Sequence, residues 1–176
     1  MSISTRRGDE GMTDLMFGRR VPKTHPRMAT LGAVDELNAA LGVVRAGEVP
    51  EELREWVDGV QSRLVGLMGV IATHEEDHAK YQEKGYQGIT GEDVSWLDDL
   101  VQELEQERRN RFRGWSRPGK AGALSGVQLD VARTIGRRAE LCSWSVEDEA
   151  LSVARQFLNR LSDVLWLLAR EGEKQG

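Results

Sequence analysis

The sequence from residue 148 to residue 170 reads DEALSVARQFLNRLSDVLWLLAR. Its apolar side chains recur every three or four positions, at Leu151, Ala154, Leu158, Leu161, Leu165 and Leu168. That spacing places them along one side of a helix with 3.6 residues per turn. The stretch therefore predicts a long helix with one buried face.

Four further segments show the same spacing, and they are residues 28–46, 50–71, 90–104 and 123–145. Pro50 suits a first helical turn, and Thr90 with Asp93 forms the start of a capping box. In the segment 123–145 we expect the inward face to carry Leu124, Val127, Val131, Ile135 and Cys142. Strand-like alternation is missing from the sequence. We predict an all-α five-helix bundle that forms one domain over residues 1–176.

Composition narrows the class of protein. Apolar residues make up 39% and charged residues 30% of 176 residues, which is typical of a globular chain. No apolar run approaches the ~20 residues of a membrane span, and the first seven residues lack the apolar core of a secretory signal. With its single cysteine, Cys142, the chain is expected to be cytoplasmic and to have no membrane partner.

Charge is distributed unevenly. The formal net charge of −5 argues against a nucleic-acid partner, but residues 108–120 carry six Lys or Arg residues, and Arg133, Arg137 and Arg138 follow. A basic region on an acidic chain favours a small anionic ligand.

The N-terminal arm, about residues 1–26, holds the stretch TRRGDEGMT at 5–13. Gly8 and Gly11 permit backbone conformations that point several N–H groups into one hollow, as in phosphate sites. The side chains able to contribute hydroxyls or charge are Thr5, Arg6, Arg7, Thr13 and Lys23. The spacing of a Walker A loop is absent. Taken alone, the pattern favours a solvated N-terminus with turn glycines over a phosphate site.

Polar residues also interrupt three of the expected helices. Arg133, Arg137 and Glu140 share one helical face. The interruptions in the other two helices are Asp35, Glu36 and Asn38, and Asn159, Ser162 and Asp163. Because buried polar groups are costly unless paired, these residues indicate a shared polar site or a subunit interface.

Residues 74–78 read HEEDH and match the zinc motif His-Glu-x-x-His. The motif lies at the polar end of a helix, and the remaining histidine, His25, is distant in sequence. We interpret the stretch as a solvated acidic loop and expect no metal ligands; the alternative is a metal site in which Glu or Asp supplies the third ligand.

Four ordered blocks resemble the PduO-type ATP:cob(I)alamin adenosyltransferases. They are TRRGDEG at 5–11; RVPK at 20–23 with GAVDELN at 32–38; VARTIGRRAE at 131–140; and LNRLSD at 158–163. The resemblance implies a five-helix bundle that assembles as a homotrimer, with active sites between subunits.

It also implies roles for individual residues. The ATP side would contain Thr5, Arg6, Arg7, Gly8, Asp9, Gly11, Thr13, Lys23, Arg137, Glu140 and Asn159. The corrinoid side would contain Arg133, Asp35, Trp115 and Phe112, with Arg133 pairing with Asp35 across the interface. Arg133, Arg137 and Asp35 would be the catalytic set.

The implied reaction is direct alkylation, in which the cobalt of cob(I)alamin attacks the 5′ carbon of ATP and expels triphosphate. Mg²⁺ would accompany the ATP, and ATP and cobalamin would both be substrates. Such a reaction depends on in-line positioning and on cations beside the leaving group.

The sequence departs from the family pattern in the arm and in one loop. Arg7 replaces a threonine, Arg6 a lysine, and Lys120 a glycine, and about two residues are inserted before Arg133. An alternative function is therefore a non-catalytic carrier or sensor that binds ATP or a corrinoid. A helical scaffold without a small-molecule site is a third possibility.

Overall fold

The computed structural model describes residue 4 and residues 6–110, 114 and 116–175. Five long helices form the bundle in this part of the chain: α1 (Pro26–Ala46), α2 (Glu51–Ile71), α4 (Gly91–Gln102), α5 (Leu124–Ser143) and α6 (Ser152–Gly172). The predicted all-α bundle is confirmed. A short helix, α3 (His78–Glu83), begins at the last residue of the stretch 74–78 that was interpreted as a loop.

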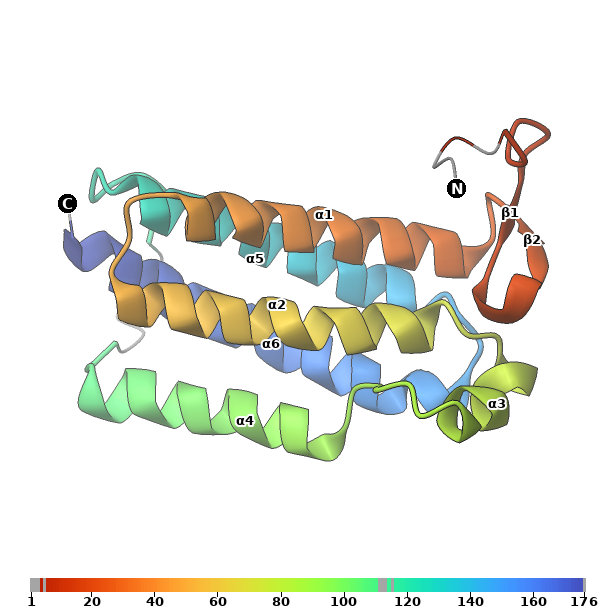
Figure 1. The fold of residues 1–176 in the computed structure, drawn as a ribbon. Helices are drawn as coiled ribbons and strands as arrows, with labels where there is room; N and C mark the ends of the chain where they lie inside the picture. Colours follow the sequence, from red (N-terminus) through yellow and green to blue (C-terminus); the bar gives the residue numbers. More distant parts are fainter. Residues whose placement is uncertain (1–3, 5, 111–113, 115, 176) are drawn as a thin grey trace.

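Helix α6 has a central position in the bundle and packs against α5, α4 and α2, while α1 packs against α5 and α2 (Figure 1). Its predicted apolar face is confirmed, because Leu158, Leu161, Leu165 and Leu168 are fully buried. The capping box at Thr90 is also present, and α4 continues into a wider helical turn over Glu103–Glu107. No helix in the described part of the chain combines the length and apolar character that a membrane span requires.

The inward face predicted for α5 was wrong. Leu124 is 69% exposed and Val131 is 50% exposed, and of the predicted set only Ile135 is buried. The buried face instead carries small residues, among them Gly126, Ala132, Gly136 and Ala139. A Cβ on Gly126 would lie 3.0 Å from the carbonyl oxygen of Ala169, so close packing of α5 on α6 explains the small residues.

The expectation that the chain forms no β-strands was also wrong. β1 (Met12–Asp14) and β2 (Arg20–Pro22) form a short antiparallel hairpin, with Thr13 opposite Val21. The hairpin carries the N-terminal arm at the end of the bundle where α1 begins (Figure 1). Leu15 and Val21 are buried, and the Met16 N–H donates to the Ala72 carbonyl at 2.9 Å. The base of the arm is therefore attached to the end of α2.

Candidate functional site

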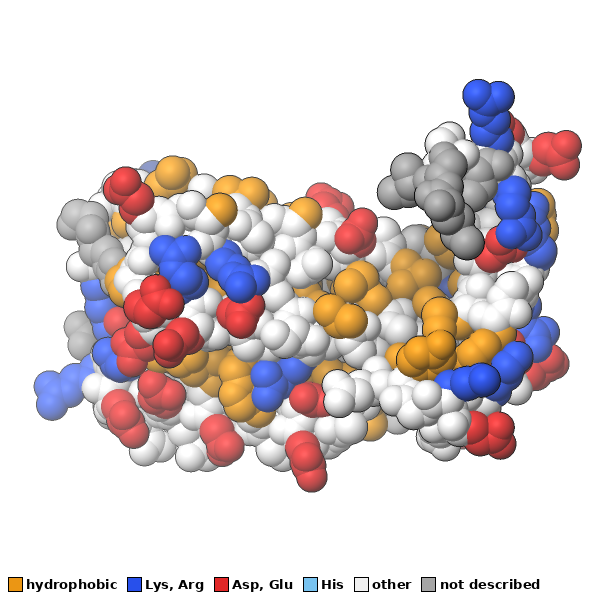
Figure 2. Space-filling view, viewed as in Figure 1, with side chains coloured by type: hydrophobic (Ala, Val, Ile, Leu, Met, Phe, Trp, Pro, Cys, Tyr) orange, Lys and Arg blue, Asp and Glu red, His pale blue; other side chains and the backbone are white. Residues whose placement is uncertain are grey.

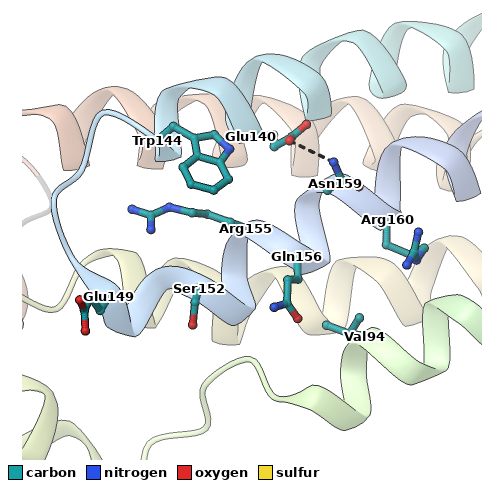
Figure 3. A pocket seen from close by; sticks show the side chains of 9 residues that line it. All are labelled: Val94, Glu140, Trp144, Glu149, Ser152, Arg155, Gln156, Asn159 and Arg160. Carbon is teal, nitrogen blue, oxygen red and sulfur yellow. Dashed lines mark hydrogen bonds between the residues drawn. The ribbon is translucent and has the colours of Figure 1, made fainter.

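A cavity of about 710 Å³ opens between α4, α5 and the first half of α6 (Figure 3). It brings together two of the predicted ATP residues, Glu140 of α5 and Asn159 of α6. The Asn159 amide donates to Glu140 Oε1 at 3.2 Å. The remaining lining residues are Val94, Trp144, Glu149, Ser152, Arg155, Gln156 and Arg160.

Glu140 and Asn159 belong to the surface of α5 and α6 that faces the cavity, which we call the α5–α6 wall. The bundle core determines where this wall lies. Glu140 follows the buried Ala139, and Asn159 follows Phe157 and Leu158, both fully buried. Because these neighbours are close-packed, the backbone that carries Glu140 and Asn159 has little freedom. Both polar side chains are therefore presented at a rigid surface.

Arg155 and Trp144 form the end of the cavity near the C-terminus of α5. The Arg155 guanidinium donates to the carbonyl of Ser143 from Nε at 3.3 Å and to that of Val146 from Nη2 at 2.5 Å. It also lies 4.9 Å from the Trp144 ring centroid, a cation–π distance (Figure 3). The sequence prediction missed this residue, although Arg155 lies one helical turn before Asn159.

The three predicted or neighbouring arginines of α5 have different surroundings. Arg137 is exposed and has no side-chain partner among the described residues, whereas Arg138 forms an ion pair with Glu36 of α1. Arg133 donates from Nε to Asp130 at 3.0 Å. The predicted partner of Arg133 within the family, Asp35, is exposed and is unpaired in the described part of this single chain.

The arm forms two tight turns around its glycines. The Asp9 N–H donates to the Arg6 carbonyl, and the Gly11 N–H donates to the Gly8 carbonyl. Gly11 has φ +78°, the left-handed conformation that glycine adopts most readily. A Cβ on Gly8 would lie 2.9 Å from Lys23 Nζ, so the predicted lysine lies directly against the glycine turn.

Other predicted residues of the arm lie on the hairpin or beside it. Arg7 forms an ion pair with Asp14 at 3.1 Å, and Arg20 donates to the Arg7 carbonyl at 3.2 Å. Thr13 is half-buried in β1. Lysine and arginine side chains gather on the arm, which stands out from the bundle (Figure 2).

Two polar contacts fix this end of the molecule. The hydrogen bond from Arg19 holds the pKa of Asp77 below its ordinary value, and joins the hairpin to the segment before α3. Deeper in the structure, Arg27 of α1 forms a buried ion pair with Asp148, and His78 Nε2 lies 2.8 Å from the same carboxylate. Burial raises the pKa of Asp148, but the hydrogen bonds from Arg27 and His78 outweigh that effect and lower it overall.

The two histidines of the HEEDH stretch serve separate purposes. His74 caps the short turn Glu75–Asp77, and His78 begins α3 and contacts Asp148. Since a turn separates them, they do not share one helical face. Among the described residues, no group of three His, Cys, Asp or Glu side chains is arranged to bind a metal ion.

The predicted site residues thus fall into separate groups in one chain. Glu140 and Asn159 line the cavity, whereas Gly8, Gly11 and Lys23 meet in the arm. None of the described arm residues lines the cavity. Thr5, Phe112 and Trp115 lie outside the described residues.

Comparison with known proteins gives a match over almost the whole chain. The model of the family described as cobalamin adenosyltransferase matches residues 3–171. The corrinoid adenosyltransferase PduO of Salmonella typhimurium is 36% identical over 172 residues, which are 97% of this chain and 49% of that protein. The chain therefore spans about half the length of that relative. A cobalamin adenosyltransferase of Cupriavidus metallidurans is 34% identical, with 99% of this chain and 89% of that protein covered.

Solved structures agree with the sequence matches. A variant of the PduO-type ATP:corrinoid adenosyltransferase of Lactobacillus reuteri, complexed with cobalamin and ATP, superposes with a TM-score of 0.85 and 26% identity. The superposition covers 98% of this chain and 94% of that one.

Proposed function

This chain belongs to the cobalamin adenosyltransferase family, and we propose that it transfers the 5′-deoxyadenosyl group of ATP to cob(I)alamin, giving adenosylcobalamin and triphosphate. The observation that carries this proposal is the meeting of Glu140 and Asn159 in one cavity. These residues belong to two separate family blocks and are 19 positions apart. A scaffold without a small-molecule site gives no reason for such a pair to line a cavity.

On the nucleotide side, we assign the arm and Arg137 of the α5–α6 wall to the triphosphate, and Glu140 and Asn159 to the rest of ATP. The turns at Gly8 and Gly11 fold the arm against Lys23, which supplies a positive charge beside them. Arg137 lies one helical turn before Glu140 and has no competing side-chain partner in the described part of the chain. Its guanidinium suits a phosphate, because it offers two parallel donors.

On the corrinoid side, we assign Arg133 and Asp35, and the family resemblance adds Phe112 and Trp115, which lie outside the described residues. Arg133 and Asp35 lie on α5 and α1, the two helices that pack against each other. The exposed apolar side chains Val43 and Val131 lie on the same two helices. Exposed apolar side chains on these two helices fit contact with a second copy of the chain.

We therefore propose a homotrimer in which the arm of one subunit completes the cavity wall of the next. The separation of arm and cavity within one chain supports this arrangement. A head-to-tail contact that closes into a ring gives identical sites at each interface. The single cysteine, Cys142, supports a cytoplasmic location for the assembly.

The chemistry needs positioning more than proton transfer. The cobalt nucleophile attacks the 5′ carbon, the carbon–oxygen bond breaks, and the electron pair leaves with triphosphate. Arginine and lysine side chains fixed beside the phosphates stabilise the charge that develops on the leaving group. The rigid wall keeps the adenosyl carbon in line with the attacking cobalt.

Magnesium would bind with the triphosphate. We assign the carboxylate of Asp9, next to Gly8 in the arm, as the ligand that the protein would supply. That donor set fits Mg²⁺, which usually keeps several waters and phosphate oxygens as ligands. When bound, it would neutralise part of the triphosphate charge.

The test is anaerobic turnover with ATP, Mg²⁺ and chemically reduced cob(I)alamin, followed through the loss of cob(I)alamin absorbance. Adenosylcobalamin and triphosphate are the expected products in equal amounts. Tight ATP binding without product would support the carrier or sensor alternative, which the remodelled loop before α5 motivates. An unchanged melting temperature with ATP would contradict a nucleotide site altogether.

A further inference from the structure

Asp130 is a buried acid that none of the family blocks includes. Its side chain on α5 is 4% exposed, and it lies between two guanidinium groups. Oδ1 accepts a hydrogen bond from Arg133 Nε at 3.0 Å, and Oδ2 accepts one from Arg170 Nη2 at 2.6 Å. A buried carboxylate with two cationic donors is held in one place from both sides.

The α6 side of this cluster is itself fixed. Arg170 also donates from Nη2 to Glu173 at 3.0 Å, and its guanidinium lies 5.1 Å from the Trp166 ring centroid. Two cations and two anions thus balance each other where solvent is largely excluded. Asp130 therefore ties Arg133 to the central helix of the bundle.

Arg133 differs in this respect from the other arginines of α5. Arg138 forms an exposed ion pair and Arg137 has no partner in the described part of the chain, whereas Arg133 is 19% exposed and is held through Nε. Fixing Nε fixes the plane of the planar guanidinium. The terminal nitrogens of Arg133 have no partner among the described residues, so they remain available for a group outside this chain.

We propose that Asp130 is a positioning residue for Arg133, fixing its guanidinium in advance for the corrinoid side of the site. The proposal rests on the proposed function, because that function assigns Arg133 to the corrinoid. Asp130 itself touches neither substrate. Its effect is on the freedom of Arg133, since a side chain ordered before binding loses less entropy when the ligand arrives.

The experiment measures two substrates separately. Asp130→Asn keeps the size of the side chain and removes its charge, so that one amide oxygen faces two guanidinium groups and Arg133 is held less firmly. We expect the KM for cob(I)alamin, and the Kd for cob(II)alamin with ATP present, to rise about tenfold, while the KM for ATP changes less than about twofold. A general loss of structure would raise both KM values, and a corrinoid affinity unchanged within about twofold would overturn the proposal.

A double-mutant cycle separates positioning from a structural role. In an Arg133→Ala background, Asp130→Asn is expected to have no further effect on corrinoid affinity, because the residue it positions is absent. An equal effect in both backgrounds would contradict the proposal. Glu173→Gln is the matched control, since it alters the same buried cluster without touching Arg133, and it should leave corrinoid affinity unchanged.

If Asp130→Asn does not fold, Arg133→Lys provides a second test of the proposal. One ammonium group cannot bind Asp130 and also direct separate nitrogens outward, so this variant should show the same loss of corrinoid affinity. Wild-type affinity in Arg133→Lys would overturn the proposal. If the wild type binds cob(II)alamin but makes no product, the proposed function fails while the cycle on Kd still decides the role of Asp130. If it binds no corrinoid, both fail.

Discussion

The arm and the α5–α6 wall carry the two groups of nucleotide residues, and they are built in different ways. The wall owes its shape to side chains such as Phe157 and Ala139, which are fully buried. The arm owes its shape to the two turns at Gly8 and Gly11 and to a hairpin of two three-residue strands. The wall is therefore rigid without ligand, whereas the arm depends on local hydrogen bonds and on its attachment to the bundle.

This difference has a consequence for substitutions. A change on the wall removes one contact from a surface that stays in place, so its effect should be confined to ligand binding. A change at the junction between the two regions should affect stability first. Ligand affinity and unfolding free energy, measured on the same variants, should therefore respond to different substitutions.

Arg137→Ala should abolish useful ATP binding, with a loss of about 100-fold or more in affinity, because a cation beside the phosphates disappears. Isothermal titration with ATP and Mg²⁺ measures it. Arg138→Ala is the matched control, since this neighbour pairs with Glu36 on the surface, and it should change affinity little. Equal losses in the two variants would mean that general charge on α5, rather than Arg137, holds the nucleotide.

Asp148→Asn should destabilise the fold by about 3 kcal/mol, because it leaves Arg27 buried without its counter-charge. Chemical unfolding measures it, and Glu147→Gln, an exposed neighbour, should have almost no effect. Asp148 lies at the junction of α1, α3 and α6, outside both the arm and the α5–α6 wall. This variant therefore tests a position that belongs to neither of the two nucleotide regions.

Asp148 should also make the stability of the fold depend on pH. The pKa of Asp148 is lowered in the folded state, so the unfolded chain binds its proton more readily. The stabilisation should be fully present above the unfolded value of about 4 and should disappear as the pH falls through the folded pKa. Unfolding curves between neutral and acidic pH should therefore converge for wild type and Asp148→Asn; a constant difference would contradict the assignment.

Lys23→Met should raise the KM for ATP about tenfold and leave the melting temperature of the protein unchanged, because Lys23 lies against Gly8 on an exposed arm. Steady-state kinetics with varied ATP measures it. Arg20→Met is the control on the same hairpin, since Arg20 pairs with Asp14. If Arg20→Met has the larger effect, the order of the hairpin matters more than the charge at Lys23.

Much of the fold could be predicted because large apolar residues mark a helix face clearly. Leu158, Leu161 and Leu165 correctly marked the buried face of α6. The prediction of the buried face of α5 was wrong because that face consists largely of small residues such as Gly136 and Ala139. Small residues give almost no periodic signal of hydrophobicity. The larger apolar residues of the same helix, Leu124 and Val131, were predicted to be buried, but they are exposed.

The site was predictable only where neighbouring residues in sequence form a family block. Glu140 and Asn159 were expected on the same ligand, and the structure places them in one cavity. Arg155 and Asp130 were missed because their contacts depend on the packing of α5 against α6. The Arg27–Asp148 pair joins residues 121 positions apart, a separation that helical periodicity cannot reveal.

If the arm of one subunit completes the wall of another, mixing two inactive variants should restore activity. Lys23→Glu disables the arm and Arg137→Ala disables the wall, so each variant alone should show almost no turnover. After co-refolding in equal amounts, half of the arms and half of the walls are intact, and about one quarter of wild-type turnover should return if they meet at random between subunits. No recovery in oligomers shown to be mixed would mean that arm and wall act within one chain, and would contradict this account.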